Sequence, residues 1–75
     1  MNTIFTLQDG TNISVTDDKQ YRIGLSIDVK YRNTGNTSGA TYEESFYLLS
    51  PSEIKRHIKK YNGELVYAVE MERPS

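Results

Sequence analysis

The stretch "YRIGLSIDVKYR", residues 21–32, decides the fold because apolar and polar side chains alternate along it. Its odd-numbered positions are apolar or aromatic: Tyr21, Ile23, Leu25, Ile27, Val29 and Tyr31. Successive side chains of a β-strand point to opposite faces of a sheet, so this period of two predicts a strand with one buried face. A slip of one residue would expose the whole apolar set to water, which constrains the register.

Residues 33–40, "NTGNTSGA", are rich in turn-forming amino acids, and we expect them to join this strand to an antiparallel partner. We predict that Arg32 pairs with Thr41. The same register sets further cross-strand pairs: Tyr31–Tyr42, Lys30–Glu43, Val29–Glu44, Ile27–Phe46 and Leu25–Leu48. Only Glu44 does not suit its face, which indicates that this end of the hairpin extends into solvent.

A first hairpin is predicted upstream, because Asp9-Gly10 is a strong hairpin dipeptide between two short runs of strand-forming residues. Two registers are open. A two-residue turn pairs Ile4 with Val15. A longer loop with a bulge gathers a larger apolar face, and we favour it for that reason: Phe5, Leu7, Ile13 and Val15.

The stretch "SPSEIKRHIKKYNG", residues 50–63, carries the signals of a helix. Ser50 is a good N-cap, Pro51 suits the first helical position, and Glu53 completes a capping box. Leu49 and Ile54 are spaced for a hydrophobic staple. We expect the helix to stop at Asn62-Gly63, with the glycine in the left-handed conformation.

The two sides of this helix differ in polarity. An apolar stripe is formed by Ile54, His57, Ile58 and Tyr61. The opposite side, which we call the basic helix arc, consists of Lys55, Arg56, Lys59 and Lys60. A last strand follows in "ELVYAVEME", residues 64–72, where Leu65, Tyr67, Val69 and Met71 alternate with the other side chains and are expected on the core side.

These elements predict a single small α+β domain over residues 1–75, in the order β-β-β-β-α-β, with residues 1–3 and 73–75 as frayed ends. A mainly antiparallel, twisted sheet is expected, with one helix packed on one face. The strand–helix–strand order favours a right-handed crossover and a parallel pair in the sheet. The chain has no cysteine, so ordinary packing or a partner subunit must stabilise so small a core.

No motif in the chain points to catalysis, a metal or a cofactor. A serine nucleophile would need His57, the only histidine, with a carboxylate, and no serine lies in a suitable context. We expect His57 to sit at the edge of the core. The acidic pairs Asp17-Asp18 and Glu43-Glu44 lack the spacing of metal ligands, and no glycine-rich phosphate loop is present. We therefore expect a protein that is not an enzyme.

The N-terminal "MNTIFTLQDG" has neither the basic nor the apolar region of a signal peptide, and no segment approaches the ~20 apolar residues of a membrane span. We expect a cytoplasmic protein with no membrane partner. The formal net charge of −1 argues against bulk attraction to nucleic acid.

Two surfaces are candidates for binding. The basic helix arc could contact phosphates or an acidic protein, but solubility and the helix dipole explain such charges without any ligand, and we favour that explanation. The second surface is the reverse of the sheet, away from the helix, where small and apolar residues meet a charged rim, as in protein interfaces. Its predicted members are Arg22, Ser26, Lys30, Arg32, Tyr47, Val66, Ala68 and Glu70. The alternative is that the first hairpin covers this reverse side.

A third candidate is weaker. The strand from Gln20 to Arg32 is long, so its far end could project as an arm with Tyr31 and Tyr42 at its stem and residues 33–40 at its tip.

We therefore expect a small non-catalytic module that binds another protein and blocks it sterically. In size, lack of cysteine and lack of enzyme motifs it is similar to the accessory inhibitors of phages and prophages, anti-CRISPR proteins among them, which act in the host cytoplasm. The similarity is one of format and aligns no motif. The alternatives are a nucleic-acid-binding module that uses the basic helix arc, and a self-associating regulatory or structural homodimer.

Overall fold

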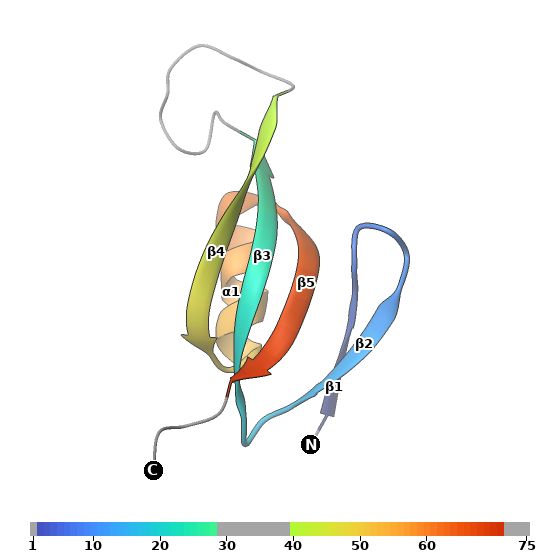
Figure 1. The fold of residues 1–75 in the computed structure, drawn as a ribbon, viewed down its shortest axis with the longest axis vertical. Coiled ribbons are helices and arrows are strands. Elements are labelled where there is room, and N and C mark those ends of the chain that lie inside the picture. The colour runs from blue at the N-terminus through green and yellow to red at the C-terminus, as the bar shows by residue number, and fades with distance from the viewer. Residues whose placement is uncertain (1, 29–39, 72–75) are drawn as a thin grey trace.

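The computed structural model describes residues 2–28 and 40–71. Its elements are β1 (Asn2–Thr6), β2 (Asn12–Thr16), β3 (Gln20–Asp28), β4 (Thr41–Leu49), α1 (Pro51–Tyr61) and β5 (Glu64–Met71). The predicted order β-β-β-β-α-β is confirmed (Figure 1). Asn2 and Thr3, expected at a frayed end, pair with Thr16 and Val15. Residues 73–75 and most of the predicted arm, residues 29–39, lie outside the described part.

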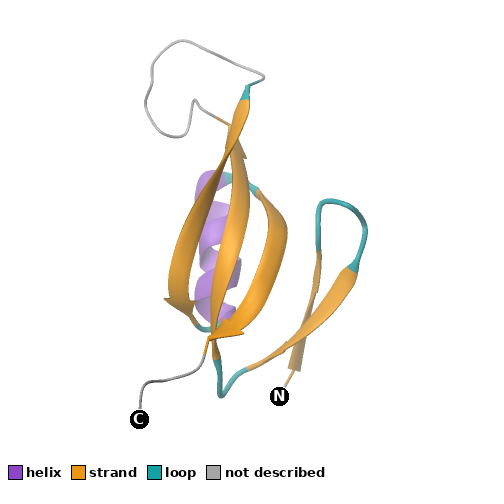
Figure 2. Ribbon diagram, viewed as in Figure 1, coloured by secondary structure: helices purple, strands orange, loops and turns teal. Residues whose placement is uncertain are grey.

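The alternating strand, β3, lies at the centre of a three-stranded sheet with the order β4-β3-β5. Both neighbours are antiparallel to β3. The expected parallel pair is therefore wrong, because β3 separates β4 from β5 and the two never meet. Helix α1 connects them behind the sheet (Figures 1 and 2). The neighbouring strands pair with both edges of β3, and α1 packs on its apolar face, where Ile54 joins the core.

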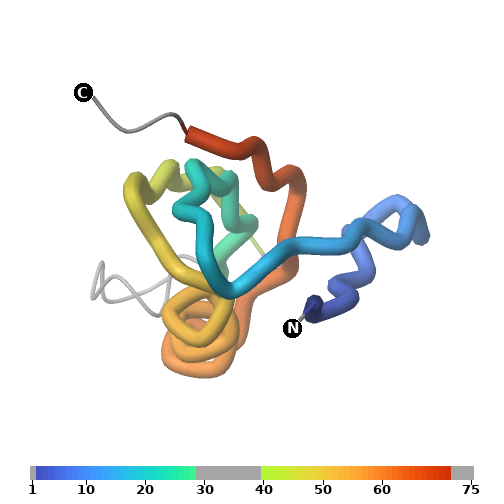
Figure 3. The backbone as a smooth tube through the Cα atoms, turned by 90° about the horizontal axis from the view of Figure 1, so that it is seen from below, coloured from blue at the N-terminus to red at the C-terminus, as the bar shows by residue number. Residues whose placement is uncertain are grey.

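The core confirms which side of β3 is buried. Ile23, Leu25 and Ile27 are 0% exposed, as is Ile54 of α1. Phe5 and Val15 of the first hairpin belong to the same core. In Figure 3 the helix lies against one side of the sheet, and the β1–β2 hairpin lies beside β5. The backbone N–H of Gln8 donates to the carbonyl of Leu65 at 2.8 Å and fastens that hairpin to β5.

The first hairpin adopts the favoured register. Phe5 pairs with Ile13, and Leu7 N–H donates across the loop to the Thr11 carbonyl at 2.7 Å. Gly10 has a φ of 92°, a conformation that glycine adopts without steric cost. Ile4, which the rejected register would have paired with Val15, is 63% exposed.

The predicted pairing of β3 with β4 is wrong by four residues. Asp28, and not Arg32, lies opposite Thr41, and Glu44 lies opposite Leu25 in place of Val29. From Thr41 to Phe46 an even shift leaves the same side chains on each face, so the apolar face survives the error. Beyond Phe46 the predicted core pair Leu25–Leu48 is wrong, because Leu48 is 51% exposed and Leu49 is buried. The observed register brings Leu49 opposite Tyr21, at the start of β3, and the helix can therefore begin at the end of the sheet.

The helix begins at Pro51 and stops at Asn62-Gly63, as predicted, but the left-handed residue is a different one. Ser50 Oγ accepts from Glu53 N–H at 3.4 Å, and Glu53 Oε1 accepts from Ser50 N–H at 2.8 Å, which is the capping box. At the other end Asn62, with a φ of 49°, takes the left-handed conformation that was expected of Gly63. Gly63 serves close packing instead, because a β-carbon there would lie 2.8 Å from the carbonyl oxygen of Ser26.

Candidate functional site

We call the side of the three-stranded sheet that faces away from α1 the open face. No described helix or strand covers it, and the first hairpin packs beside β5 (Figure 3). The buried side chains of that hairpin, Phe5 and Val15, contribute to the core on the helix side. The alternative in which the hairpin covers the reverse of the sheet is therefore not what the fold adopts.

A β-bulge in each outer strand decides which side chains reach the open face. On β4, Tyr47 and Leu48 together lie against the single residue Arg22. On β5, Val66 is the extra residue opposite the Gly24–Leu25 step. Each bulge reverses the alternation of the strand beyond it. The φ of Leu48, 60°, marks the first bulge as a strained backbone position.

As a result, Tyr67 lies opposite Gly24 and Val69 opposite Arg22, both on the open face, although both were expected in the core. Paired residues of an antiparallel sheet share a face. We call Arg22, Tyr47, Tyr67 and Val69 the Arg22 patch.

The ring of Tyr67 lies directly over Gly24. A β-carbon on that glycine would be 2.3 Å from Cε2 of the ring, so only glycine permits this contact. The Tyr67 hydroxyl accepts a hydrogen bond from Nε of Arg22 at 3.2 Å and lies 3.3 Å from Oγ of Ser45. Because these residues come from β3, β4 and β5, the tyrosine ties all three strands together across the open face.

The guanidinium of Arg22 is held between two aromatic rings. Its Cζ lies 5.5 Å from the centre of the Tyr47 ring and 5.7 Å from that of Tyr67. These distances fall within the range of cation–π attraction. The hydrogen bond to Tyr67 and then the charge interactions with both tyrosines raise the pKa of Arg22 further above its ordinary value. The hydrogen bond and the two rings restrain the orientation of this exposed arginine.

The Arg22 patch and its neighbour Leu48 leave much apolar surface in water. Tyr47 is 55% exposed, Leu48 51% and Val69 49%. Tyrosine and arginine are the residues most often found at the energetic centres of protein interfaces. Apolar residues that cluster on a surface are found at interaction sites more often than apolar residues that are scattered singly.

The structure separates the residues that were predicted for the reverse of the sheet. Arg22, Ser26 and Tyr47 lie on the open face as predicted. The placement of Ala68 and Glu70 is wrong, because the β5 bulge sets them opposite Ile23 and Tyr21 on the helix side. Ala68 packs against the core.

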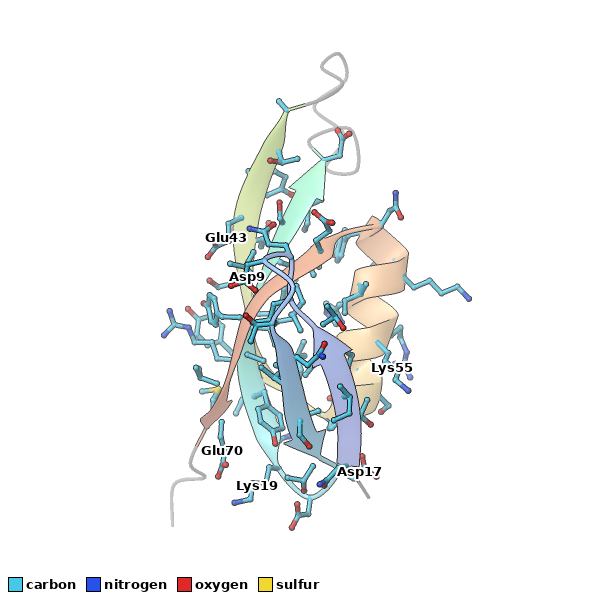
Figure 4. All side chains as sticks on the ribbon, turned by 90° about the vertical axis from the view of Figure 1, so that its right-hand side faces the viewer. Asp9, Asp17, Lys19, Glu43, Lys55 and Glu70 are labelled. Atoms are coloured by element: carbon cyan, nitrogen blue, oxygen red, sulfur yellow. The ribbon has the colours of Figure 1, made fainter. Side chains whose placement is uncertain are left out.

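Three other residues were predicted for that surface: Val66, Lys30 and Arg32. Val66 is the bulged residue itself and is half-buried. Lys30 and Arg32 lie outside the described residues. Glu70, already placed on the helix side, forms an ion pair with Lys19 at 2.8 Å near the end of the sheet (Figure 4).

The basic helix arc forms as expected on the far side of the molecule. Lys55, Arg56, Lys59 and Lys60 are all exposed. Figure 4 shows Lys55 on the helix side and Glu43 on the sheet side. Lys59 and Lys60 lie in the last turn, where positive charge complements the helix dipole. This placement gives the two lysines a structural purpose that needs no ligand.

The single histidine lies at the edge of the core, as predicted. Its Nδ1 lies 2.8 Å from the carbonyl oxygen of Glu53, and its ring meets Phe46 edge-on with 4.7 Å between centroids. Phe46 also stacks on Tyr61 at 5.7 Å. These contacts make His57 part of an aromatic cluster that joins α1 to β4.

Comparison with protein-family models, curated proteins and solved structures finds no match to this chain. Within residues 2–28 and 40–71, no helix has the length and apolar character needed to cross a membrane.

Proposed function

We propose that the protein is a non-catalytic module that binds another protein through the open face of its sheet and blocks that partner sterically. The observation that carries this proposal is the Arg22 patch, in which a charged arginine is fixed between tyrosines amid exposed apolar surface. In format it is an accessory inhibitor of the phage or prophage kind, acting in the cytoplasm.

The rigidity of the patch supports a binding role. Side chains that are already ordered lose less conformational entropy when a partner docks, and affinity rises accordingly. Tyr67 is ordered by Arg22, Ser45 and the space above Gly24 before any partner arrives. None of the four patch residues belongs to the core cluster on the other side of the sheet.

Site-specific photo-crosslinking in the cell that makes the protein tests this proposal. A photoreactive benzoylphenylalanine replaces either Tyr47 on the open face or Lys55 on the basic helix arc. We expect a discrete protein adduct from position 47 and none from position 55. Adducts from position 55 alone, or from neither position, would refute binding through the open face.

Two matched variants distinguish binding through the Arg22 patch from non-specific binding by any exposed apolar residue. Val69→Glu should abolish the adduct from position 47, because it places a charge at the apolar side of the patch. Ile4→Glu should leave it intact, since Ile4 is equally apolar and more exposed, at 63% against 49%, but lies on the first hairpin. Equal loss with both variants would mean that the adduct does not report on the open face.

A further inference from the structure

The guanidinium of Arg22 carries more N–H donors than its hydrogen bond to Tyr67 uses. Its hydrogen bond within the described residues is donated by Nε to the Tyr67 hydroxyl. The two terminal amino groups, Nη1 and Nη2, form the other end of the planar fork, and Arg22 is exposed. Because two rings hold the plane in place, the direction of Nη1 and Nη2 is set before a partner binds.

A planar pair of N–H donors matches a carboxylate, whose two oxygens accept both hydrogen bonds in parallel. The apolar surroundings strengthen such a pair. When a partner covers Tyr47 and Val69 it excludes water around Arg22, and attraction between opposite charges grows as the local dielectric constant falls.

We propose that the Arg22 patch recognises a carboxylate side chain, aspartate or glutamate, in a segment of the partner protein. This inference rests on the proposed function and specifies the chemistry of the same surface. The carboxylate docks end-on against Nη1 and Nη2, and an apolar neighbour in the same segment covers Val69 or Tyr47.

The charges around the patch select against other occupants. Glu43 lies on the same face, with Oε2 only 3.0 Å from where a β-carbon of Gly24 would be, and Glu64 pairs with Ser26 on that face. A nucleic acid would bring many phosphates against these carboxylates. A single acidic side chain meets less repulsion, although Glu43 is near enough to act electrostatically on Arg22. A second copy of this protein fits less well as the partner. If two Arg22 patches overlapped, their two positively charged guanidinium groups would face and repel each other.

Selection from a random peptide library displayed on phage tests the inference without knowledge of the native partner. The wild-type protein and Arg22→Glu are immobilised and selected in parallel. We expect peptides enriched in aspartate and glutamate on the wild type, and a reversal to lysine and arginine on Arg22→Glu. Enrichment that is the same on both proteins, or no acidic preference on the wild type, would overturn the inference.

A synthetic peptide selected on the wild type then serves as a defined probe. Arg22→Gln should weaken its binding about tenfold or more, as loss of a charge-assisted pair implies. Arg22→Lys should recover only part of that loss, because an ammonium lacks the fork. Lys55→Gln should have no effect. Thermal unfolding of each variant confirms that the fold persists, and equal weakening by Lys55→Gln would contradict a role for Arg22.

The two proposals fail in distinguishable ways. If the adduct from position 47 forms and is insensitive to Arg22→Gln, the open face binds a partner but the carboxylate inference is wrong. If sedimentation shows a dimer that Arg22→Glu dissociates, the occupant is a second copy, and a foreign acidic segment is excluded.

Discussion

Replacing Gly24 with alanine probes how the fold builds the Arg22 patch. A β-carbon at position 24 would lie 2.3 Å from Cε2 and 2.8 Å from Cδ2 of Tyr67. Non-bonded carbon atoms sit about 3.5–4.0 Å apart, so the ring must retreat by more than about 1 Å. Its hydroxyl would then leave hydrogen-bonding range of Arg22 and Ser45, which now lie at 3.2 and 3.3 Å.

Two effects of opposite sign determine the change in stability. Alanine in a strand is favoured over glycine by about 0.5–1 kcal/mol, because glycine loses more backbone entropy on folding. Overpacking against Tyr67 costs about 1–3 kcal/mol. We therefore expect Gly24→Ala to lower the free energy of unfolding by about 1 kcal/mol, which corresponds to a fall in Tm of about 4–8 °C for a domain of this size.

The effect of Gly24→Ala on stability should change sign when Tyr67 is also replaced. In Tyr67→Ser the ring is absent, so Gly24→Ala should raise stability by about 0.5–1 kcal/mol. Urea unfolding of the wild type, both single variants and the double variant measures this coupling. If Gly24→Ala destabilises the protein equally with and without the ring, Tyr67 does not lie over Gly24 and the reasoning is refuted.

Three further outcomes are expected. Ile54→Ala should lower the free energy of unfolding, measured in urea, by about 2–5 kcal/mol, because Ile54 is 0% exposed. Ile4→Ala should change it by less than about 0.5 kcal/mol, since Ile4 is 63% exposed. Similar losses in both variants would place the core elsewhere. Asn62→Val should cost about 1–2 kcal/mol through the left-handed backbone at Asn62, while Asn62→Gly should not; equal effects on Tm would contradict the observed helix end. Hydrogen bonds from the backbone and side chain of Ser50 lower the pKa of Glu53, so this carboxylate stabilises the fold above its ordinary pKa and loses that contribution as pH falls through the lowered value. Measured Tm against pH should therefore fall less steeply below about pH 4.3 in Glu53→Gln, and an unchanged slope would contradict the capping box.

The parts of the fold that could be predicted are those set by neighbouring residues. The alternation along β3 specifies its buried side, and Ser50, Pro51 and Glu53 specify the start of α1 through contacts within one helical turn. The hairpin at Asp9-Gly10 likewise follows from local turn chemistry. In each case the deciding interactions lie within a few positions of one another in the chain.

The register of β4 and the two bulges could not be predicted, because they depend on how distant segments fit together. Nothing local identifies Leu48 as a residue with positive φ, since a bulky side chain disfavours that conformation. Because of the bulge at Val66, Tyr67 and Val69 point to the open face and not to the core. The sequence pattern alone therefore did not predict these two members of the Arg22 patch.

One feature of the sequence could have predicted that an aromatic ring lies against β3. A glycine inside an otherwise strong strand, as at Gly24, often marks a place where another group approaches the backbone closely. An aromatic residue on a neighbouring strand is a natural candidate for that group. The same signal does not reveal which aromatic residue it is without the register.

Nuclear Overhauser contacts of the Tyr67 ring test most directly whether the bulges turn the patch onto the open face. We expect strong contacts from its ring protons to the α-protons of Gly24 and the side chain of Arg22. Contacts to Ile54 of α1 in their place would put Tyr67 in the core and leave the open face without its patch.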